Sequence, residues 1–158
     1  MTFEEIYRTY WQKVHRLCMG YVNDSDWAKD IAQETFITVW QQLPKFRNES
    51  SMGTWVFRIA SNHCLRQVEK QKRMPQSKLP ADIAEVLQPD IDSKIEFLYK
   101  CISELPETDR IIISLELEDV KQTEIANIVG ISEANVRVRI HRMKETLSHK
   151  FKNYEKHN

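Results

Sequence analysis

The sequence predicts an all-α protein made of two small helical domains joined by a flexible linker. Its 158 residues include only three glycines and five prolines, and 41% are hydrophobic. The sequence has no long β-branched alternation, whereas apolar residues recur at helical spacing along most of its length. A proline-interrupted stretch separates two sets of such segments. We therefore expect a first domain over residues 1–73, a linker over 74–93 and a second domain over 94–158.

The first two helices have clear start and stop signals. Thr2 and Glu5 have the spacing of a capping box, and apolar residues then recur at helical spacing to Tyr21. The residues Asn23, Asp24 and Ser25 come next and form a turn and a cap. A second helix is predicted to continue from there until Pro44 stops it.

The remaining helices of the chain are predicted from similar signals. A loop over residues 45–51 leads into a third long helix that extends to residue 73. Three prolines then interrupt an acidic stretch, a composition typical of a linker. A helix from residue 94 is broken at Leu105-Pro106. Another follows to about Leu117, since proline fits the first turn of a helix.

The segment 123–147 has the sequence form of a helix-turn-helix. Gly130 permits the positive φ that ends one helix, and Ser132 can cap the next helix, which is predicted to begin at Glu133. Ile131 between them can fill the angle between the two helices. The core face of the second helix would consist of four apolar residues at helical spacing: Val136, Ile140, Met143 and Leu147.

The opposite face of this last helix has the chemistry of a DNA-reading helix. Residues 133–152 contain six Lys/Arg and two acids, a local charge of +4, although the whole chain has a formal charge of zero. The amide of Asn135 suits adenine and the guanidinium of Arg137 suits guanine, whereas Arg139 and Arg142 are expected to hold phosphates. The residues predicted to contact duplex DNA are Ser132, Glu133, Asn135, Arg137, Val138, Arg139, His141 and Arg142.

A second polar stripe lies on the predicted second helix, apart from its apolar core stripe. It consists of Asp30, Gln33, Glu34, Ile37 and Gln41. A polar band with one central apolar residue suits docking onto the helices of a partner protein. A solvated helix face is the simpler interpretation of this stripe taken alone, and that alternative stays open.

The third helix and the loop before it combine cations with aromatic residues. Side chains spaced by four residues can follow a phosphate backbone, and neighbouring aromatic rings can stack on an unpaired base. The alternative is that the aromatic residues belong to the core and the charged ones are merely solvated. The candidate residues are Phe46, Arg47, Asn48, Trp55, Arg58, Asn62 and Arg66.

Catalytic and metal chemistry find little support in the sequence. The five histidines are scattered, and the chain has neither a Gly-rich phosphate loop nor an HExxH motif, so we predict no catalytic residue, metal ligand or cofactor. The three cysteines are far apart without a CxxC pair, which predicts buried structural thiols. The sequence shows neither a signal-peptide pattern nor an apolar run of about 18 residues, so we expect a cytoplasmic protein without membrane insertion.

Taken together, these motifs make the chain resemble the extracytoplasmic-function sigma factors, which are specificity subunits of bacterial RNA polymerase. Its first half carries DIAQETFITVW at 30–40 and TWVFRIASNHC at 54–64, similar to region two of that family. Its second half carries LPETDR at 105–110, EIANIVGIS at 124–132 and then NVRVRIHRMKETL, similar to region four. The resemblance covers nearly the whole length, although Asp119 stands where glycine is common.

The resemblance implies a role for each surface. The stripe on the second helix would dock on the clamp helices of the largest subunit of the polymerase core. The loop and third-helix residues would engage the −10 promoter element and capture a flipped base, and the recognition helix would read the −35 element as duplex. The chain would then be an alternative sigma factor without catalytic chemistry, controlled by an anti-sigma factor.

Two other functions remain as alternatives at this point. A conventional helix-turn-helix transcriptional regulator would use the first half for ligand binding or dimerisation and would bind a palindrome tightly by itself. An interaction protein could instead mimic sigma regions to sequester a regulator. A sigma factor differs from both, because it binds promoters strongly only together with the polymerase core.

Overall fold

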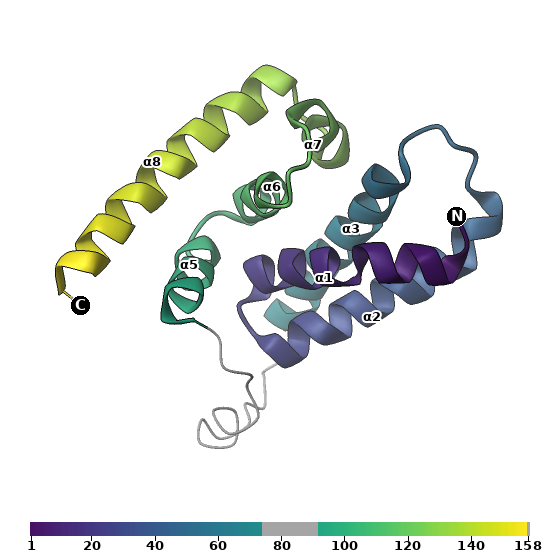
Figure 1. The fold of residues 1–158 in the computed structure, drawn as a ribbon, viewed down its shortest axis with the longest axis horizontal. Helices are drawn as coiled ribbons and strands as arrows, with labels where there is room; N and C mark the ends of the chain where they lie inside the picture. The colour runs from purple at the N-terminus through teal and green to yellow at the C-terminus, as the bar shows by residue number, and fades with distance from the viewer. Residues whose placement is uncertain (74–91, 158) are drawn as a thin grey trace.

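The computed structural model describes residues 1–73 and 92–157 of the chain. Within these ranges it is helical without any strand, as predicted (Figure 1). The elements are α1 (Phe3–Val22), α2 (Ser25–Gln42), the short 3-10 helix η1 (Leu43–Lys45), α3 (Met52–Arg73), α5 (Ser93–Ser103), α6 (Glu107–Leu117), α7 (Gln122–Val129) and α8 (Glu133–His157). Most of the predicted linker lies outside the described residues, and the predicted domain boundaries stay a prediction.

The predicted capping hydrogen bonds are present at the start of each of the first two helices. The Glu5 backbone N–H donates to the Thr2 hydroxyl at 3.3 Å, and the Thr2 N–H donates to the Glu5 carboxylate at 3.2 Å. Asp24 caps α2 by accepting from the Trp27 N–H at 3.0 Å. Because these bonds satisfy N–H groups that a helix leaves free, they fix where each helix begins.

Helices α1, α2 and α3 pack into a bundle around an apolar core. Leu17, Ile31 and Val56 are fully buried there, and each such side chain contributes about 1.5–3 kcal/mol through its removal from water. The thiols of Cys18 and Cys64 are also buried, with their sulfurs 3.8 Å apart. The hydrogen bond with Cys64, together with burial, raises the pKa of Cys18. These thiols are structural, as predicted.

A polar contact also ties α2 to α3. His63 on α3 is half-buried, and its Nε2 lies 2.8 Å from the Thr38 hydroxyl. Burial lowers the pKa of His63 below its ordinary value, so the imidazole is neutral at pH 7. This histidine therefore belongs to the packing between the two helices.

The second half is built around α6, whose isoleucines Ile111, Ile112 and Ile113 are buried. The last helix, α8, packs on α5, α6 and α7 and lies on the side away from α1–α3 (Figure 1). It extends to His157, about three turns beyond Leu147, where the predicted helix-turn-helix segment ends, since 3.6 residues make one turn. The reason is an aromatic contact with α5, in which Phe97 stacks on Tyr154 at 4.2 Å between ring centroids.

Two turns in this half depend on a left-handed backbone conformation. Gly130 ends α7 with φ +77°, and nothing lies within 4 Å of the place where its Cβ would be, so conformation rather than space favours glycine here. Asp119 adopts φ +59° between α6 and α7. This explains why glycine is common at that place in the family that the chain resembles, since aspartate is among the few other residues that tolerate such a φ.

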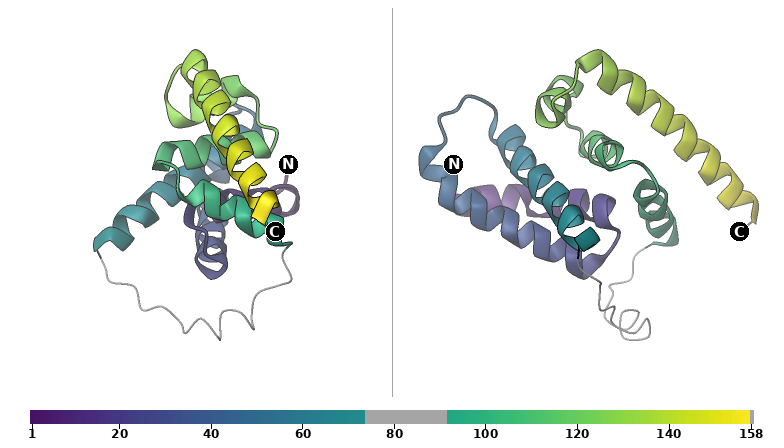
Figure 2. Two further views of the ribbon diagram at one scale, coloured as in Figure 1. Left: turned by 90° about the vertical axis from the view of Figure 1, so that its left-hand side faces the viewer. Right: turned by 180° about the vertical axis from the view of Figure 1, so that it is seen from behind.

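The two halves are docked on one another, which the sequence did not predict. Figures 1 and 2 show α1 beside α5 and α6, and these helices are in contact, as are α3 and α7. At the closest point, Gly20 on α1 faces Ser114 on α6, and a Cβ on the glycine would overlap the serine hydroxyl. With the Ser114 hydroxyl in this position, the approach of the two helices favours glycine at position 20.

Arginine side chains connect the docked helices on either side of Gly20. Arg110 on α6 donates from Nη1 to the Tyr21 carbonyl at 3.1 Å, and its guanidinium lies 5.2 Å from the centre of the Tyr21 ring. On α1, Arg16 makes a bidentate contact with the Glu118 carboxylate, the second bond being 2.8 Å long. Bidentate pairs are stronger and more directional than single hydrogen bonds. The contact between the two halves thus combines a close approach of the helix backbones with charged side-chain contacts.

No helix in the described ranges has the length and apolar character needed to cross a membrane. Those ranges also contain no cluster of three or more histidine, cysteine or acidic side chains that could hold a metal ion.

Candidate functional site

The predicted helix-turn-helix is formed by α7, a tight turn and α8. The Gly130 N–H donates to the Ala126 carbonyl at 2.8 Å, which closes α7. Ser132 then caps α8, because its hydroxyl accepts from the Asn135 N–H at 3.1 Å. Together these bonds fix the direction in which α8 leaves the turn and the orientation of its first residues.

The two faces of α8 separate as the sequence predicted. Its four core positions, Val136, Ile140, Met143 and Leu147, are buried. Asn135, Arg137 and Arg142 on the other face are exposed, and Val138 exposes 46% of its surface. We call this exposed face the recognition surface. The residues predicted to contact duplex DNA lie along it, with Arg139 half-buried at its edge: Ser132, Glu133, Asn135, Arg137, Val138, Arg139, His141 and Arg142.

His141 and Arg139 on the recognition surface contact acidic side chains of the protein itself. His141 is exposed and lies 3.1 Å from the carboxylate of Glu145 one turn later. Arg139 is half-buried and donates to Asp109 on α6 and to the side chain of Asn135. Its guanidinium is therefore engaged inside the protein, in contrast to a freely exposed phosphate-binding arginine.

The aromatic and charged residues around the first turn of α3 line a cavity of about 380 Å³, which we call the loop cavity. Ser51 caps α3 by accepting from the Thr54 N–H at 3.1 Å, and this places Trp55 in the first turn. The rings of Phe46 and Trp55 lie 4.7 Å apart between centroids, tilted by 36°. The cavity is lined by Lys45, Phe46, Arg47, Glu49, Ser50, Trp55, Arg58 and Asn127.

Not all the predicted residues of this group line the loop cavity. Asn48 adopts φ +58° in the loop, and Asn62 and Arg66 are exposed further along α3. Asn62 and Arg66 continue the cavity-lining face of α3 towards the middle of that helix. In contrast, Asn127 of α7 does line the cavity, although it comes from the other half of the chain. Sequence reasoning missed it, because only the docking of the two halves brings it there.

The predicted stripe on α2 is exposed at every position: Asp30, Gln33, Glu34, Ile37 and Gln41. Ile37 exposes 56% of its surface, which is unusual for an isoleucine in a packed bundle. Glu34 accepts a hydrogen bond from the Gln67 side chain at 2.8 Å, which anchors the stripe to α3. The stripe is thus a mixed polar and apolar surface.

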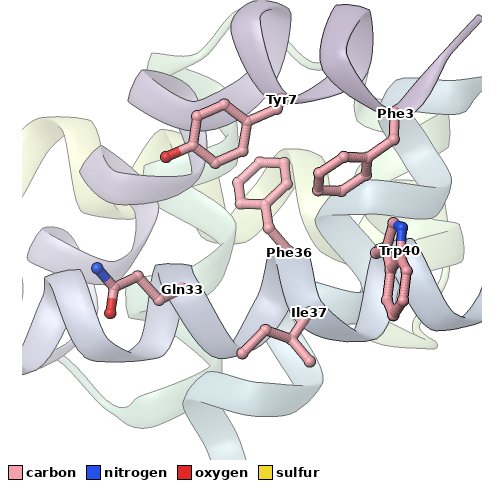
Figure 3. Close-up of a pocket in the computed structure, with 6 residues that line it drawn as sticks. All are labelled: Phe3, Tyr7, Gln33, Phe36, Ile37 and Trp40. Atoms are coloured by element: carbon pink, nitrogen blue, oxygen red, sulfur yellow. The ribbon is translucent and has the colours of Figure 1, made fainter.

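Beside this stripe, α1 and α2 form an open apolar groove of about 420 Å³ (Figure 3). We call it the α1–α2 groove, and its lining residues are Phe3, Tyr7, Gln33, Phe36, Ile37 and Trp40. Trp40 exposes 63% of its surface and Tyr7 exposes 40%. The sequence analysis missed both, although Trp40 lies three residues after Ile37 and therefore on the same helix face.

Comparison with known proteins assigns each half of the chain to a sigma-factor region. The Sigma-70 region 2 family matches residues 6–74, and the family described as Sigma-70, region 4 matches residues 96–147. RNA polymerase sigma-H factor of Pseudomonas aeruginosa is 32% identical, over 92% of this chain and 83% of that protein. ECF RNA polymerase sigma-E factor of Escherichia coli is 31% identical, over 89% of this chain and 82% of that one.

Solved structures have the same fold over nearly the whole length. The sigma factor RpoE from Bartonella quintana, solved with the anti-sigma factor NepR, gives a TM-score of 0.75 at 18% identity, covering 95% of this chain and 96% of that one. CnrH, solved with the cytosolic domain of CnrY, gives 0.71 at 19% identity, covering 96% and 88%. With both regions matched in order and relatives above 30% identity, the chain belongs to the extracytoplasmic-function sigma factors of RNA polymerase.

Proposed function

We propose that this chain binds the core of RNA polymerase and directs it to promoters that carry a −35 and a −10 element. In this proposal the recognition surface reads the −35 element as duplex DNA. The loop cavity and the adjoining face of α3 capture unpaired bases of the −10 element. The α2 stripe and the α1–α2 groove dock on the clamp helices of the core enzyme. The chain contributes specificity and promoter opening, and the core performs the chemistry.

One observation carries this proposal. The region 2 and region 4 matches fall, in that order, on the two halves that carry the loop cavity and the recognition surface. A simple helix-turn-helix regulator would need only the second of these surfaces. A protein that uses both must contact DNA at two separated places, as promoter recognition by a holoenzyme requires.

Run-off transcription with purified core polymerase tests the function directly. A pool of promoter fragments is transcribed by the core alone and by the core with this chain. New transcripts from specific promoters are the expected result, together with weak promoter binding by the chain alone. Tight binding to a palindrome in the absence of core would favour a conventional regulator. Failure to produce promoter-dependent transcripts from any fragment would count against the sigma function.

We also propose that an anti-sigma factor controls this chain in the cytoplasm, where polymerase acts. The support is that two proteins of the same fold were solved as complexes, one with the anti-sigma factor NepR and one with the cytosolic domain of CnrY. Co-purification of the chain from its native cells, with and without added core polymerase, tests this. A partner that core polymerase displaces is the expected result.

Replacing Asp30 and Glu34 together by alanine should weaken binding to core polymerase. Both side chains are exposed at the edge of Ile37, where charges at a rim contribute about 0.2–1 kcal/mol each. The expected loss is therefore about 2- to 30-fold in affinity, measured by fluorescence titration of labelled chain with core. Glu145→Ala combined with Glu155→Ala removes the same charge from α8 and should not change the affinity. Equal affinities of the two double variants for core polymerase would show that Asp30 and Glu34 do not lie in the interface with core.

Replacing Arg137 by alanine should lower −35 recognition at one base pair. An arginine that contacts a base edge contributes about 1–3 kcal/mol, whereas a phosphate contact weakens all sequences alike. Arg142→Ala should accordingly weaken binding to matched and scrambled −35 elements by a similar factor. The measurement is competition between promoter variants for the holoenzyme at two salt concentrations. Arg137 would lose its base-reading role if Arg137→Ala affected matched and scrambled elements equally.

A further inference from the structure

A chain of hydrogen bonds connects the LPETDR motif to the recognition surface. Asp109, within this motif on α6, accepts from Nη1 of Arg139 at 3.1 Å. The same guanidinium donates from Nε to the side-chain oxygen of Asn135 at 3.2 Å. The Asp109 and Arg139 side chains are 20% and 36% exposed, so water competes only in part with these bonds.

This contact determines which end of the Asn135 side chain faces the DNA. Arginine carries only hydrogen-bond donors, so the group of Asn135 that meets Arg139 must be its carbonyl oxygen. The amide NH₂ at the other end of the planar group then points away from Arg139. Because Asn135 is exposed and its backbone N–H is held by Ser132, this NH₂ is available at the first turn of α8.

We infer that Asp109 and Arg139 are positioning residues for sequence reading, because they hold Asn135 with its two amide N–H donors towards the major groove. Asp109 fixes the guanidinium, and the guanidinium fixes the carboxamide. This inference rests on the proposed function and refines it, since the sequence alone had suggested a phosphate contact for Arg139. It also gives the LPETDR motif a part in DNA reading, although no residue of the motif lies on the recognition surface.

The orientation has a consequence for the base that Asn135 selects. Donors recognise the acceptors of the major groove, which are N7 and O6 of guanine, N7 of adenine and O4 of thymine, and they disfavour the N4 amine of cytosine. A freely rotating asparagine would instead favour adenine through paired contacts from both its oxygen and its NH₂. We therefore expect an acceptor at the base edge facing Asn135, with adenine and guanine bound about equally.

The test uses holoenzyme assembled from the full chain and core polymerase. Promoters with each of the four bases at every −35 position compete for binding, which yields a base profile for each variant. The variants are Asn135→Ala, Asp109→Ala and Arg139→Lys, the last of which keeps the charge but loses the planar fork. Glu116→Gln is the matched control, because Glu116 pairs with Lys144 at 3.5 Å between the same two helices.

Asn135→Ala should lose discrimination at one −35 position by about 2- to 13-fold, the equivalent of one hydrogen bond. Asp109→Ala and Arg139→Lys free Asn135 to rotate, so at the same position they should change the profile from equal use of adenine and guanine to a preference for adenine. Glu116→Gln should keep the wild-type profile. A purely structural role for Asp109 would lower affinity for all promoters equally, and a phosphate contact by Arg139 would leave Arg139→Lys close to wild type. Either result would overturn the inference.

The inference and the proposed function can fail separately. If wild-type holoenzyme distinguishes −35 sequences while Asp109→Ala keeps its base profile, only the positioning role is wrong. If wild-type holoenzyme does not distinguish −35 sequences, the proposed function is wrong and the inference with it.

Discussion

Replacing Gly20 by leucine is expected to separate the two halves of the molecule. A Cβ at this position would overlap the Ser114 hydroxyl and lie 3.4 Å from Ser114 Cβ and 3.7 Å from a methyl carbon of Ile102. Leucine adds three more carbon atoms beyond a Cβ that already meets the Ser114 hydroxyl. Overpacking of this kind costs about 1–3 kcal/mol, and the docked halves can relieve it by moving apart. Small-angle X-ray scattering should show a larger radius of gyration.

A double variant is the control, because it changes Gly20 without the clash. Gly20→Ala combined with Ser114→Ala removes the hydroxyl that a new Cβ would meet, and the next atom lies at an ordinary contact distance of 3.4 Å. This double variant should stay docked and scatter like the wild type. An unchanged radius of gyration in Gly20→Leu would show that α1 and α6 can move past the leucine without separation of the halves.

Separation of the halves matters because the docked arrangement brings parts of the two halves together that would contact different promoter elements in the proposed function. Trp55 and Asn127, one from each half, line the same loop cavity. The −35 and −10 elements are about 25 base pairs apart by their numbering, or about 85 Å along the duplex. On the proposed function, we therefore expect the halves to separate when the holoenzyme binds a promoter. Gly20→Leu should accordingly bind a promoter with core at least as tightly as the wild type does.

Most of the fold could be predicted from the sequence, because helix periods and caps are local. Thr2, Asp24 and Ser132 cap helices by contacts with residues three positions later, and such contacts can be read from spacing. The end of α8 could not be read in the same way. Its last turns are held by contact with Phe97 on α5, which is far away in the sequence.

In the candidate sites too, features within one helix could be predicted from the sequence, whereas features that join two helices could not. The exposed face of α8 and the stripe on α2 were predictable, since each lies on a single helix. The α1–α2 groove, Asn127 in the loop cavity and the bond between Asp109 and Arg139 each join two elements. Such pairs depend on how the helices pack. From the sequence, Arg139 and Arg142 have the same predicted phosphate contact, and only the bond to Asp109 on α6 makes Arg139 different.

Replacing Trp55 by alanine should greatly reduce promoter opening. The Trp55 ring lies in the first turn of α3, tilted against Phe46 at the wall of the loop cavity. An aromatic ring that stacks on an unpaired base contributes about 1–3 kcal/mol. The holoenzyme should therefore bind single-stranded −10 DNA about 5- to 150-fold less tightly, measured by fluorescence anisotropy. Run-off transcription from duplex promoters should fall accordingly.

Loss of a tryptophan also removes packing, so the experiment needs a matched variant. Trp27 on α2 is likewise half-buried against the core but does not line the loop cavity. Trp27→Ala should lower the melting temperature by a similar amount and leave binding of single-stranded DNA unchanged. Trp55→Phe retains an aromatic face and should recover part of the binding. If Trp55→Ala and Trp27→Ala lose the same affinity, Trp55 stabilises the bundle and does not capture a base.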